Sequence, residues 1–218
     1  MARGRPPAHT REQVVDTAIR LADSEGLAAV TMRRIATEIG AGAMSLYTYV
    51  PDKDRLLDLM VDRVGGEFAP VGITGDWRAD LMAIAAAQRA LMLAHPWLPA
   101  ALPNRRLTGR NMLAYLERGL AALAPTGLGG ATKMELIALV TGFVASYVTN
   151  ELAAATPTAE QVALITEAIS TGDFPHLGSA LAENGQGREP SFERIATWMI
   201  TGLVEQAIRP GPAARSSS

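Results

Sequence analysis

The segment that decides the fold spans residues 31–53 and reads TMRRIATEIGAGAMSLYTYVPDK. Thr31 is placed to cap a helix, and four apolar residues then repeat at helical spacing: Met32, Ile35, Ala36 and Ile39. Gly40 ends this helix, a turn follows, and a second short helix is predicted over residues 43–49, before the helix-breaking Pro51. This order predicts a helix-turn-helix, a module that holds one helix in the major groove of DNA.

The second of these helices is too short to be stable alone, so packing must hold it in place. Leu46 and Val50 are the apolar residues that can anchor it to the preceding helices. Its other side chains are small or amphipathic, which suits contacts with base edges and thymine methyl groups. We therefore predict a DNA-contacting surface formed by Thr31, Arg33, Ala43, Met44, Ser45, Tyr47, Thr48, Tyr49 and Lys53.

Three of these residues have a second interpretation. The hydroxyl groups of Tyr47 and Tyr49 can reach phosphates, but both rings suit a half-buried core position equally well. Lys53 falls in the first turn of the next predicted helix, where its positive charge opposes the helix dipole. A DNA phosphate would compensate for that charge; pairing with Asp54 or Asp58 is the alternative.

A basic arm, residues 1–9, precedes the first predicted helix and reads MARGRPPAH. Arg3 and Arg5 have the spacing of arms that enter a minor groove or touch phosphates, so we include them in the predicted DNA-binding set. The alternative is a solvated, frayed terminus.

Composition describes a globular chain without bulk basic charge. The protein has 218 residues, of which 48% are hydrophobic and 19% charged, with a net charge of −2. Residues 1–63 carry nine Lys or Arg and nine Asp or Glu, so any DNA binding must come from individually placed side chains. The absence of cysteine excludes disulfides, and no signal peptide is visible at the N-terminus. We expect a cytoplasmic location.

The rest of the chain reads as helices separated by glycine and proline. Helices are predicted over residues 11–25, 31–39, 43–49, 52–64, 76–95, 104–124, 131–155, 158–170 and 190–208, with a loop at 172–189. The apolar stretch 136–150 is interpreted as a buried core helix rather than a membrane span, so no membrane partner is expected. The predicted fold is all-α. It has a three-helix helix-turn-helix DNA-binding domain (residues 1–66), a larger helical ligand-binding and dimerisation domain (67–209) and a disordered tail (210–218).

Two predicted helices of the larger domain have the apolar faces needed for pairing two chains. A four-helix interface built from two copies is predicted to use Ile137, Val140, Val144, Val148, Ile195, Trp198, Met199, Gly202, Leu203 and Gln206. The alternative is that these side chains belong to the chain's own core. A two-fold dimer would place its two recognition helices about 34–36 Å apart on a near-palindromic site.

A ligand pocket is expected between the long helices, near their connectors. The candidate lining residues are Met82, Gln88, Met92, His95, Trp97, Leu102, Met112, Tyr115, Leu116, Phe143, Tyr147 and Asn150. The chain has nine methionines, which suit an adaptable apolar cavity. Most of these side chains also suit the core of any helical bundle, and His95 suits a hydrogen-bonded helix end.

Enzyme chemistry has no support in the sequence. The three histidines lie in the arm, at a predicted helix end and in a predicted loop. No metal-ligand spacing, phosphate-binding Gly-rich loop or Gly-x-Ser-x-Gly motif occurs, so neither a cofactor nor a metal ion is expected.

Residues 10–63 resemble the N-terminal DNA-binding domain of the TetR family of bacterial transcriptional repressors. The resemblance rests on the order and spacing of the segment beginning Thr-Met-Arg-Arg-Ile-Ala, of Leu46-Tyr47, and of Tyr49 and Lys53. It implies that the predicted DNA-contacting positions from Arg33 to Lys53 contact DNA. The chain departs from the family at the turn, where Gly40-Ala41-Gly42 replaces the commoner Gly-Val-Ser, and at Val50, where Phe is commoner.

The second half of the chain resembles the tetracycline-repressor-type C-terminal domain more loosely, through Asp76-Trp77-Arg78, Arg89-Ala90-Leu91 and His95-Pro96-Trp97. The tetracycline repressor holds a magnesium–drug chelate partly through a histidine late in its fourth helix. The chain has Val64-Gly65-Gly66 in that region, so tetracycline and magnesium binding are not transferred.

These observations predict a dimeric, ligand-responsive transcriptional repressor. It would bind a palindromic operator in double-stranded DNA and be released by a small, mostly apolar effector. The alternative is a ligand-independent DNA-binding dimer, or an activator, of the same fold.

Overall fold

The computed structural model describes residues 9–102, 109–153, 158–184 and 191–209. Across these residues the chain forms helices and no strand, which confirms the all-α prediction. The elements are α1 (Arg11–Glu25), η1 (Leu27–Ala29), α2 (Met32–Ile39), α3 (Ala43–Leu46), α4 (Lys53–Gly65), α5 (Trp77–Ala94), α6 (Leu98–Ala101), α7 (Arg110–Ala122), η2 (Ala124–Thr126), α8 (Gly130–Ala153), α9 (Ala159–Ser170), α10 (Pro175–Asn184) and α11 (Phe192–Ile208). Arg3, Arg5 and the tail at 210–218 lie outside the described residues.

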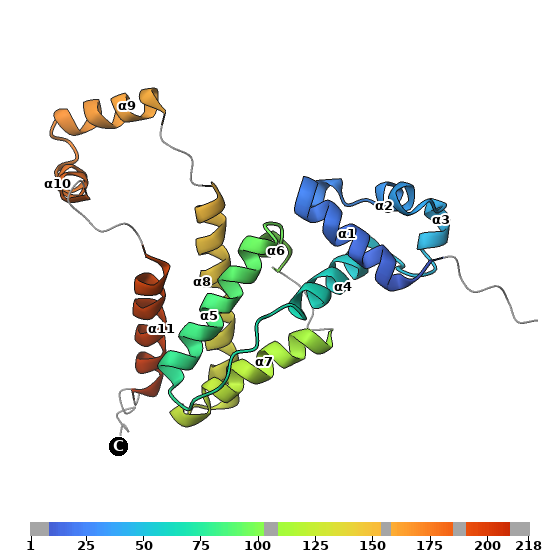
Figure 1. Ribbon diagram of the computed structural model, residues 1–218. Helices are drawn as coiled ribbons and strands as arrows, with labels where there is room; N and C mark the ends of the chain where they lie inside the picture. Colours follow the sequence, from blue (N-terminus) through green and yellow to red (C-terminus); the bar gives the residue numbers. More distant parts are fainter. Residues whose placement is uncertain (1–8, 103–108, 154–157, 185–190, 210–218) are drawn as a thin grey trace, which may run out of the picture.

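Helices α1 to α4 form a small N-terminal unit at one side of the molecule (Figure 1). Thr10, Thr31 and Asp52 each cap a helix by accepting a backbone N–H with a side-chain oxygen. Gly40 ends α2 in the left-handed conformation, with φ 68° and ψ 33°, which glycine adopts without a steric penalty. These local signals explain why the predicted bounds of α1, α2 and α4 agree with the structure.

Helix α8 is the central element of the larger C-terminal part. It packs against α5, α7 and α11, and five of its side chains are buried there: Leu136, Ile137, Val140, Val144 and Val148. By length and composition alone α8 could cross a membrane. Its position among three packed helices is that of a bundle's core helix.

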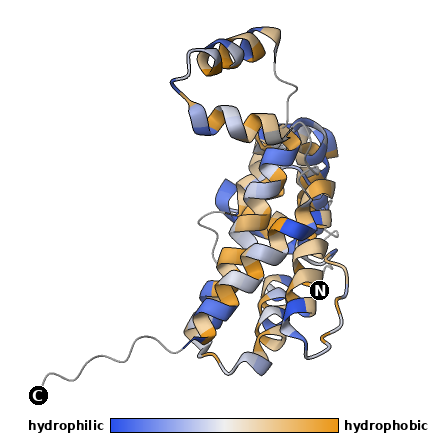
Figure 2. Cartoon of the chain, turned by 90° about the vertical axis from the view of Figure 1, so that its left-hand side faces the viewer, coloured by the Kyte–Doolittle hydropathy of each residue, from blue (hydrophilic) through white to orange (hydrophobic). Residues whose placement is uncertain are grey.

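One predicted loop is wrong. Residues 175–184, within the segment interpreted as a loop, form α10, which begins with proline at its first position. Leu177 and Leu181 lie one helical turn apart, but the surrounding glycine, asparagine and proline residues masked this signal. Together α9 and α10 form an arm that projects beyond the bundle (Figures 1 and 2), and none of the described side chains of the arm is buried.

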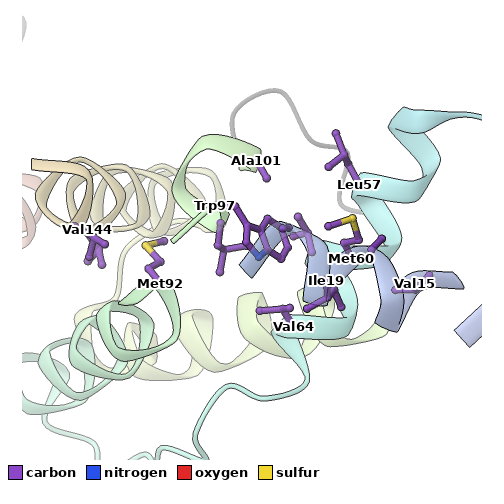
Figure 3. Close-up of a cluster of buried hydrophobic side chains, with 14 of the residues drawn as sticks. Val15, Ile19, Leu57, Met60, Val64, Met92, Trp97, Ala101 and Val144 are labelled. Carbon is purple, nitrogen blue, oxygen red and sulfur yellow. The ribbon is translucent and has the colours of Figure 1, made fainter. Parts of the chain in front are cut away.

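The N-terminal and C-terminal parts share one continuous hydrophobic core. Figure 3 shows Trp97 pointing toward side chains of α1 and α4, including Ile19 and Met60. The loop before α5 is held by Asp80, which is 1% exposed and accepts from Thr74 N, Thr74 Oγ1 and Gly75 N. Burial opposes ionisation of Asp80, but these hydrogen bonds outweigh it and lower its pKa. Because they share one core, the N-terminal and C-terminal parts are packed together.

Candidate DNA-binding surface and ligand pocket

Helix α3 is held against the N-terminal core as predicted: Leu46 and Val50 are fully buried. On the opposite side, Met44 is 80% exposed and Tyr47 is 46% exposed. Large apolar side chains left in water are unusual on a small domain and indicate a surface that meets a partner.

The two hydroxyl residues on α3 and its C-terminal turn are already bonded to the backbone. Ser45 Oγ donates to the carbonyl of Gly42 at 2.6 Å, and Thr48 Oγ1 donates to the carbonyl of Ser45 at 2.6 Å. Because each hydroxyl has one proton, each oxygen faces solvent as a hydrogen-bond acceptor. In this arrangement Ser45 and Thr48 are equipped to accept from base amino groups rather than to donate to phosphates.

The positive charges around α3 differ in availability. Arg34 is paired with Glu25 and Glu38, each at 3.1 Å. Arg33, on the same turn of α2, and Lys53, the first residue of α4, are exposed. Thr31 caps α2 by accepting from Arg34 N at 3.1 Å. Of the predicted DNA-contacting residues, only Ala43 and Tyr49 are partly buried, and DNA contact by this set stays a prediction.

A polar cluster centred on the buried His95 joins the N-terminal part to the C-terminal part. His95 Nδ1 lies 2.8 Å from Asp23 Oδ1, and His95 Nε2 lies 3.2 Å from Glu67 Oε2. Trp97 Nε1 also donates to Asp23 Oδ1, at 2.6 Å. Burial opposes protonation of His95, but the hydrogen bonds and charges of Asp23 and Glu67 outweigh it and raise its pKa. His95 and Trp97, which were predicted to line the ligand pocket, hold α1 against the connector between α5 and α6.

A second junction links α4 to α7. Gly109, which precedes α7, offers no capping side chain, and Asp62 of α4 takes that role by accepting from Asn111 N at 2.9 Å and Met112 N at 3.1 Å. A Cβ atom built on Gly109 would lie 1.9 Å from the Asp62 carboxylate, so only glycine leaves room for this cap. This contact could not be predicted from the sequence, because Asp62 resembles any exposed acid on an amphipathic helix.

The largest cavity, of about 540 Å³, lies between α6, α7 and α8. It is lined by Pro99, Leu102, Met112, Tyr115, Leu116, Met134, Ile137, Ala138, Thr141, Gly142, Ala145, Ser146 and Thr149. A smaller cavity of about 70 Å³ shares four of these residues and reaches α5 and α4. It is lined by Val61, Gly65, Phe68, Gln88, Leu91, Met92, Leu98, Leu102, Asn111, Met112, Tyr115 and Thr141. The two cavities are adjacent parts of one site. Among the described residues, its lining is mostly apolar and has no carboxylate or basic side chain.

Half of the predicted pocket residues line these cavities: Gln88, Met92, Leu102, Met112, Tyr115 and Leu116. Besides His95 and Trp97, four others lie elsewhere. Phe143 and Tyr147 form an aromatic cluster with Phe192 of α11. Met82 Sδ lies 3.7 Å from Thr197 Oγ1 of α11, and Asn150 is exposed.

The sequence interpretation missed the face of α8 that lines the larger cavity. This face carries small or hydroxyl-bearing residues at helical spacing, from Ala138 through Gly142 and Ala145 to Thr149. Small residues open space along a helix, but the pattern alone does not say whether a helix or a ligand fills that space.

The face of α8 that was predicted to pair two chains is buried inside the single chain. Ile137, Val140, Val144 and Val148 are at most 4% exposed within the single chain, because that face of α8 packs on its own bundle. On α11 the outcome differs: Trp198 is 66% exposed, Gly202 and Gln206 are exposed, and Ile195, Met199 and Leu203 are partly exposed. Leu139, one turn before Phe143 on α8, is 53% exposed. The accessible apolar surface thus lies on α11 and on another face of α8.

An all-α chain with an exposed helix-turn-helix and a separate internal cavity is, by class, a ligand-responsive DNA-binding regulator. Residues 14–60 match the family model for bacterial regulatory proteins of the tetR family. Residues 69–207 match the model for the tetracyclin repressor-like C-terminal domain. The chain belongs to the TetR family of transcription regulators, which confirms the family resemblance and identifies it as a DNA-binding regulator rather than an enzyme.

Similar proteins are found in Streptomyces and Saccharopolyspora species. The chain is 35% identical over 207 residues to the HTH-type transcriptional repressor DrrR1 of Streptomyces coeruleorubidus, covering 89% of this chain and 76% of that protein. It is 34% identical to an HTH-type transcriptional regulator of Saccharopolyspora erythraea, covering 92% and 87%. Apo ActR of Streptomyces coelicolor superposes with a TM-score of 0.78 at 29% identity, covering 91% and 98%. ActR has also been solved in complex with actinorhodin and with (S)-DNPA.

Proposed function

We propose that this protein is a homodimeric transcriptional repressor that binds a two-fold symmetric operator and is released when a small, mostly apolar molecule occupies the cavity between α6, α7 and α8. The observation that carries this proposal is the Asp62 cap on α7. It connects the helix that follows the DNA-contacting segment to the helix that supplies three cavity residues: Met112, Tyr115 and Leu116.

The DNA-binding half of the proposal rests on α3 and its flanks. Met44, Ser45, Tyr47 and Thr48 form one exposed surface, with Arg33 and Lys53 as the charged residues beside it. Residues 1–63 have no net charge, so one copy offers few phosphate contacts, and two copies are needed for tight binding. Names of similar proteins support repression, since DrrR1 is named a transcriptional repressor.

Dimer formation is supported by apolar surface that the single chain leaves in water. Trp198 and Leu139 are more than half exposed, although the opposite faces of α11 and α8 are core. The α9–α10 arm adds Leu164, which is 67% exposed, and Phe174, which is 51% exposed. A two-helix arm with no buried side chain cannot be stabilised by its own packing, and a second chain would supply the missing contacts.

The effector is proposed to be neutral, flat and mostly hydrocarbon. The lining residues are apolar except for hydroxyls and amides, which disfavours a bare charge inside the cavity. A volume of about 540 Å³ accommodates a polycyclic molecule of drug size. ActR, a similar protein, has been solved with a bound small molecule, actinorhodin. The protein would act in the cytoplasm, where its DNA target lies.

The experiment that tests this function starts by selecting binding sites from random duplex DNA with the purified full chain. We expect an inverted repeat, and a dimer bound to it in sedimentation. Actinorhodin is then titrated against the complex, and DNA release is followed by fluorescence anisotropy. A recovered site without two-fold symmetry would refute the dimeric operator. Release by no apolar polycyclic compound would leave a ligand-independent DNA-binding protein.

A further inference from the structure

Gln88 of α5 is 6% exposed and lines the smaller of the two cavities, which is called the inner cavity because it reaches α5 and α4. Its side-chain oxygen is buried and has no hydrogen-bond partner within the described residues. We infer that Gln88 Oε1 is the ligand's polar anchor: the site selects flat apolar molecules that carry a hydroxyl or amine N–H donor at the end that enters the inner cavity. This inference rests on the proposed ligand-binding function and deepens it.

The orientation of the Gln88 amide follows from a chain of hydrogen bonds that begins at a backbone carbonyl. Thr141 Oγ1 donates to the carbonyl oxygen of Ile137 at 2.8 Å, which uses its only proton. Tyr115 Oη lies 2.7 Å from Thr141 Oγ1, so the tyrosine must be the donor in that pair. The Tyr115 oxygen is then left as an acceptor.

The side chain of Gln88 also acts on Tyr115 as a hydrogen-bond donor does, because it lowers the pKa of the phenol against the larger opposing effect of burial. Because the tyrosine proton is already given to Thr141, Gln88 must donate through Nε2. Its carbonyl oxygen is consequently the free end of the chain. The backbone carbonyl of Ile137 thus orients, through two hydroxyls, the Gln88 amide so that its oxygen is the acceptor left without a partner.

This acceptor discriminates between ligands of equal size. A hydroxyl or amine placed beside Gln88 would satisfy Oε1, whereas a methoxy, carbonyl or carboxylate group would set one acceptor against another. Burial also raises the pKa of Tyr115, so this phenol stays neutral and brings no charge to the cavity. Discrimination of this kind is strong because it leaves a buried polar group unpaired in the wrong complex.

This contact lies in the smaller of the two cavities. The inner cavity holds about 70 Å³, enough for a small polar substituent and the edge of one ring. It shares Leu102, Met112, Tyr115 and Thr141 with the larger cavity, where the apolar body of the ligand would lie. The larger cavity thus selects a ligand by its shape, and the inner cavity selects it by one hydrogen bond.

The test uses 2-aminoanthracene, 2-methoxyanthracene and anthracene as probes, with binding to the DNA-free full chain followed by their fluorescence. The wild-type protein should bind the amine about tenfold more tightly than the methoxy compound, as expected for one hydrogen bond gained in place of an acceptor clash. Gln88→Leu should reduce this ratio to below about twofold while still binding anthracene. Tyr115→Phe removes the acceptor that holds Nε2, so the amide can rotate, and the preference should also disappear.

Asn150→Leu is the matched control, because it replaces an exposed amide outside both cavities and should keep the wild-type ratio. Equal binding of amine and methoxy probes by the wild-type protein, or an unchanged ratio in Gln88→Leu, would overturn the inference. Donor-selective binding without DNA release would support it while refuting the proposed repressor mechanism. Binding of none of the three probes would overturn both.

Discussion

Asp62 of α4 and Asn111 of α7 are joined by two hydrogen bonds: Asn111 N donates to Asp62 Oδ1 at 2.9 Å, and Asn111 Nδ2 donates to the Asp62 carbonyl at 2.8 Å. Helix α4 begins seven residues after α3 ends, and α7 carries residues of the cavity wall. A ligand that shifts α7 must therefore either move α4 or break these bonds. Differential affinity for the two arrangements is what would convert ligand binding into loss of DNA binding.

Asp62→Ala should uncouple the two halves of the molecule. Without the carboxylate, α7 loses its N-terminal cap, which is formed by the hydrogen bonds from Asn111 N and Met112 N to α4. The loss should lower the free energy of unfolding by about 0.5–2 kcal/mol. Operator affinity and ligand affinity measured separately should change little, but ligand-induced DNA release should fall severalfold. The measurement is operator anisotropy with and without saturating ligand.

Gly109→Ala tests the same contact from the other side, because a Cβ there would displace the Asp62 carboxylate. It should reproduce the uncoupling. Gly129→Ala, where a Cβ meets nothing within 4 Å, is the matched control. Full ligand response in both Asp62→Ala and Gly109→Ala would show that coupling takes another route.

His95→Leu should destabilise the protein most at low pH. The pKa of His95 is raised in the folded chain by Asp23 and Glu67, so its stabilising contribution is complete below the unfolded value of about 6.5. It is lost as pH rises through the higher folded value. Urea unfolding at several pH values should therefore show a difference of about 1–3 kcal/mol at low pH that narrows at alkaline pH. A difference that widens with pH would contradict the ion-pair assignment.

Gly42→Ser should strengthen both α3 and operator binding. Gly42 occupies the N-cap of α3 without a side-chain cap, its φ is −77°, and a Cβ there meets nothing within 4 Å. A serine hydroxyl can cap the helix, worth a few tenths of a kcal/mol over glycine, and can also reach a phosphate. Thermal unfolding and operator affinity measure the two effects. Gly42→Ala adds the Cβ without the hydroxyl, and an equal gain with alanine would exclude the hydroxyl as the cause.

Trp198→Glu should prevent dimer formation. The indole is 66% exposed on α11, and a charge at the centre of an apolar interface is costly to bury. We expect a monomer in sedimentation equilibrium and at least tenfold weaker operator binding. Leu113→Glu changes a 58% exposed residue on α7 and serves as the control. A dimer that persists in Trp198→Glu would place the interface elsewhere.

Lys53→Ala should weaken binding to specific and random DNA by similar factors. A lysine at a phosphate contributes no sequence information, but it releases a counterion. The slope of log affinity against log salt should fall by about one per contact. Arg34→Ala is the comparison, because Arg34 is already paired with Glu25 and Glu38. Equal slopes for wild-type and Lys53→Ala proteins would remove Lys53 from the contact set.

Local sequence signals were sufficient for the DNA-binding half. Thr31, Gly40 and Asp52 act within one helical turn of their own positions, so their roles could be read without knowing the rest of the structure. Leu46 and Val50 followed from the need to anchor a short helix. Helix α10 was not predicted, because the glycine, asparagine and proline residues around it obscured the helical spacing of its apolar residues.

The pocket, the junctions and the accessible face of α8 were decided only by tertiary structure. His95 and Asp23 are separated by 72 positions, and nothing local to either residue indicates the other. Helix α8 is apolar on more than one side, so periodicity could not say which side becomes core and which lines a cavity. That choice depends on where α5, α7 and α11 pack. The sequence by itself thus determined the helix-turn-helix and the caps of α1, α2 and α4, because these depend on neighbours along the chain. The position of each α8 face and the Asp62 and His95 contacts depend on neighbours in space.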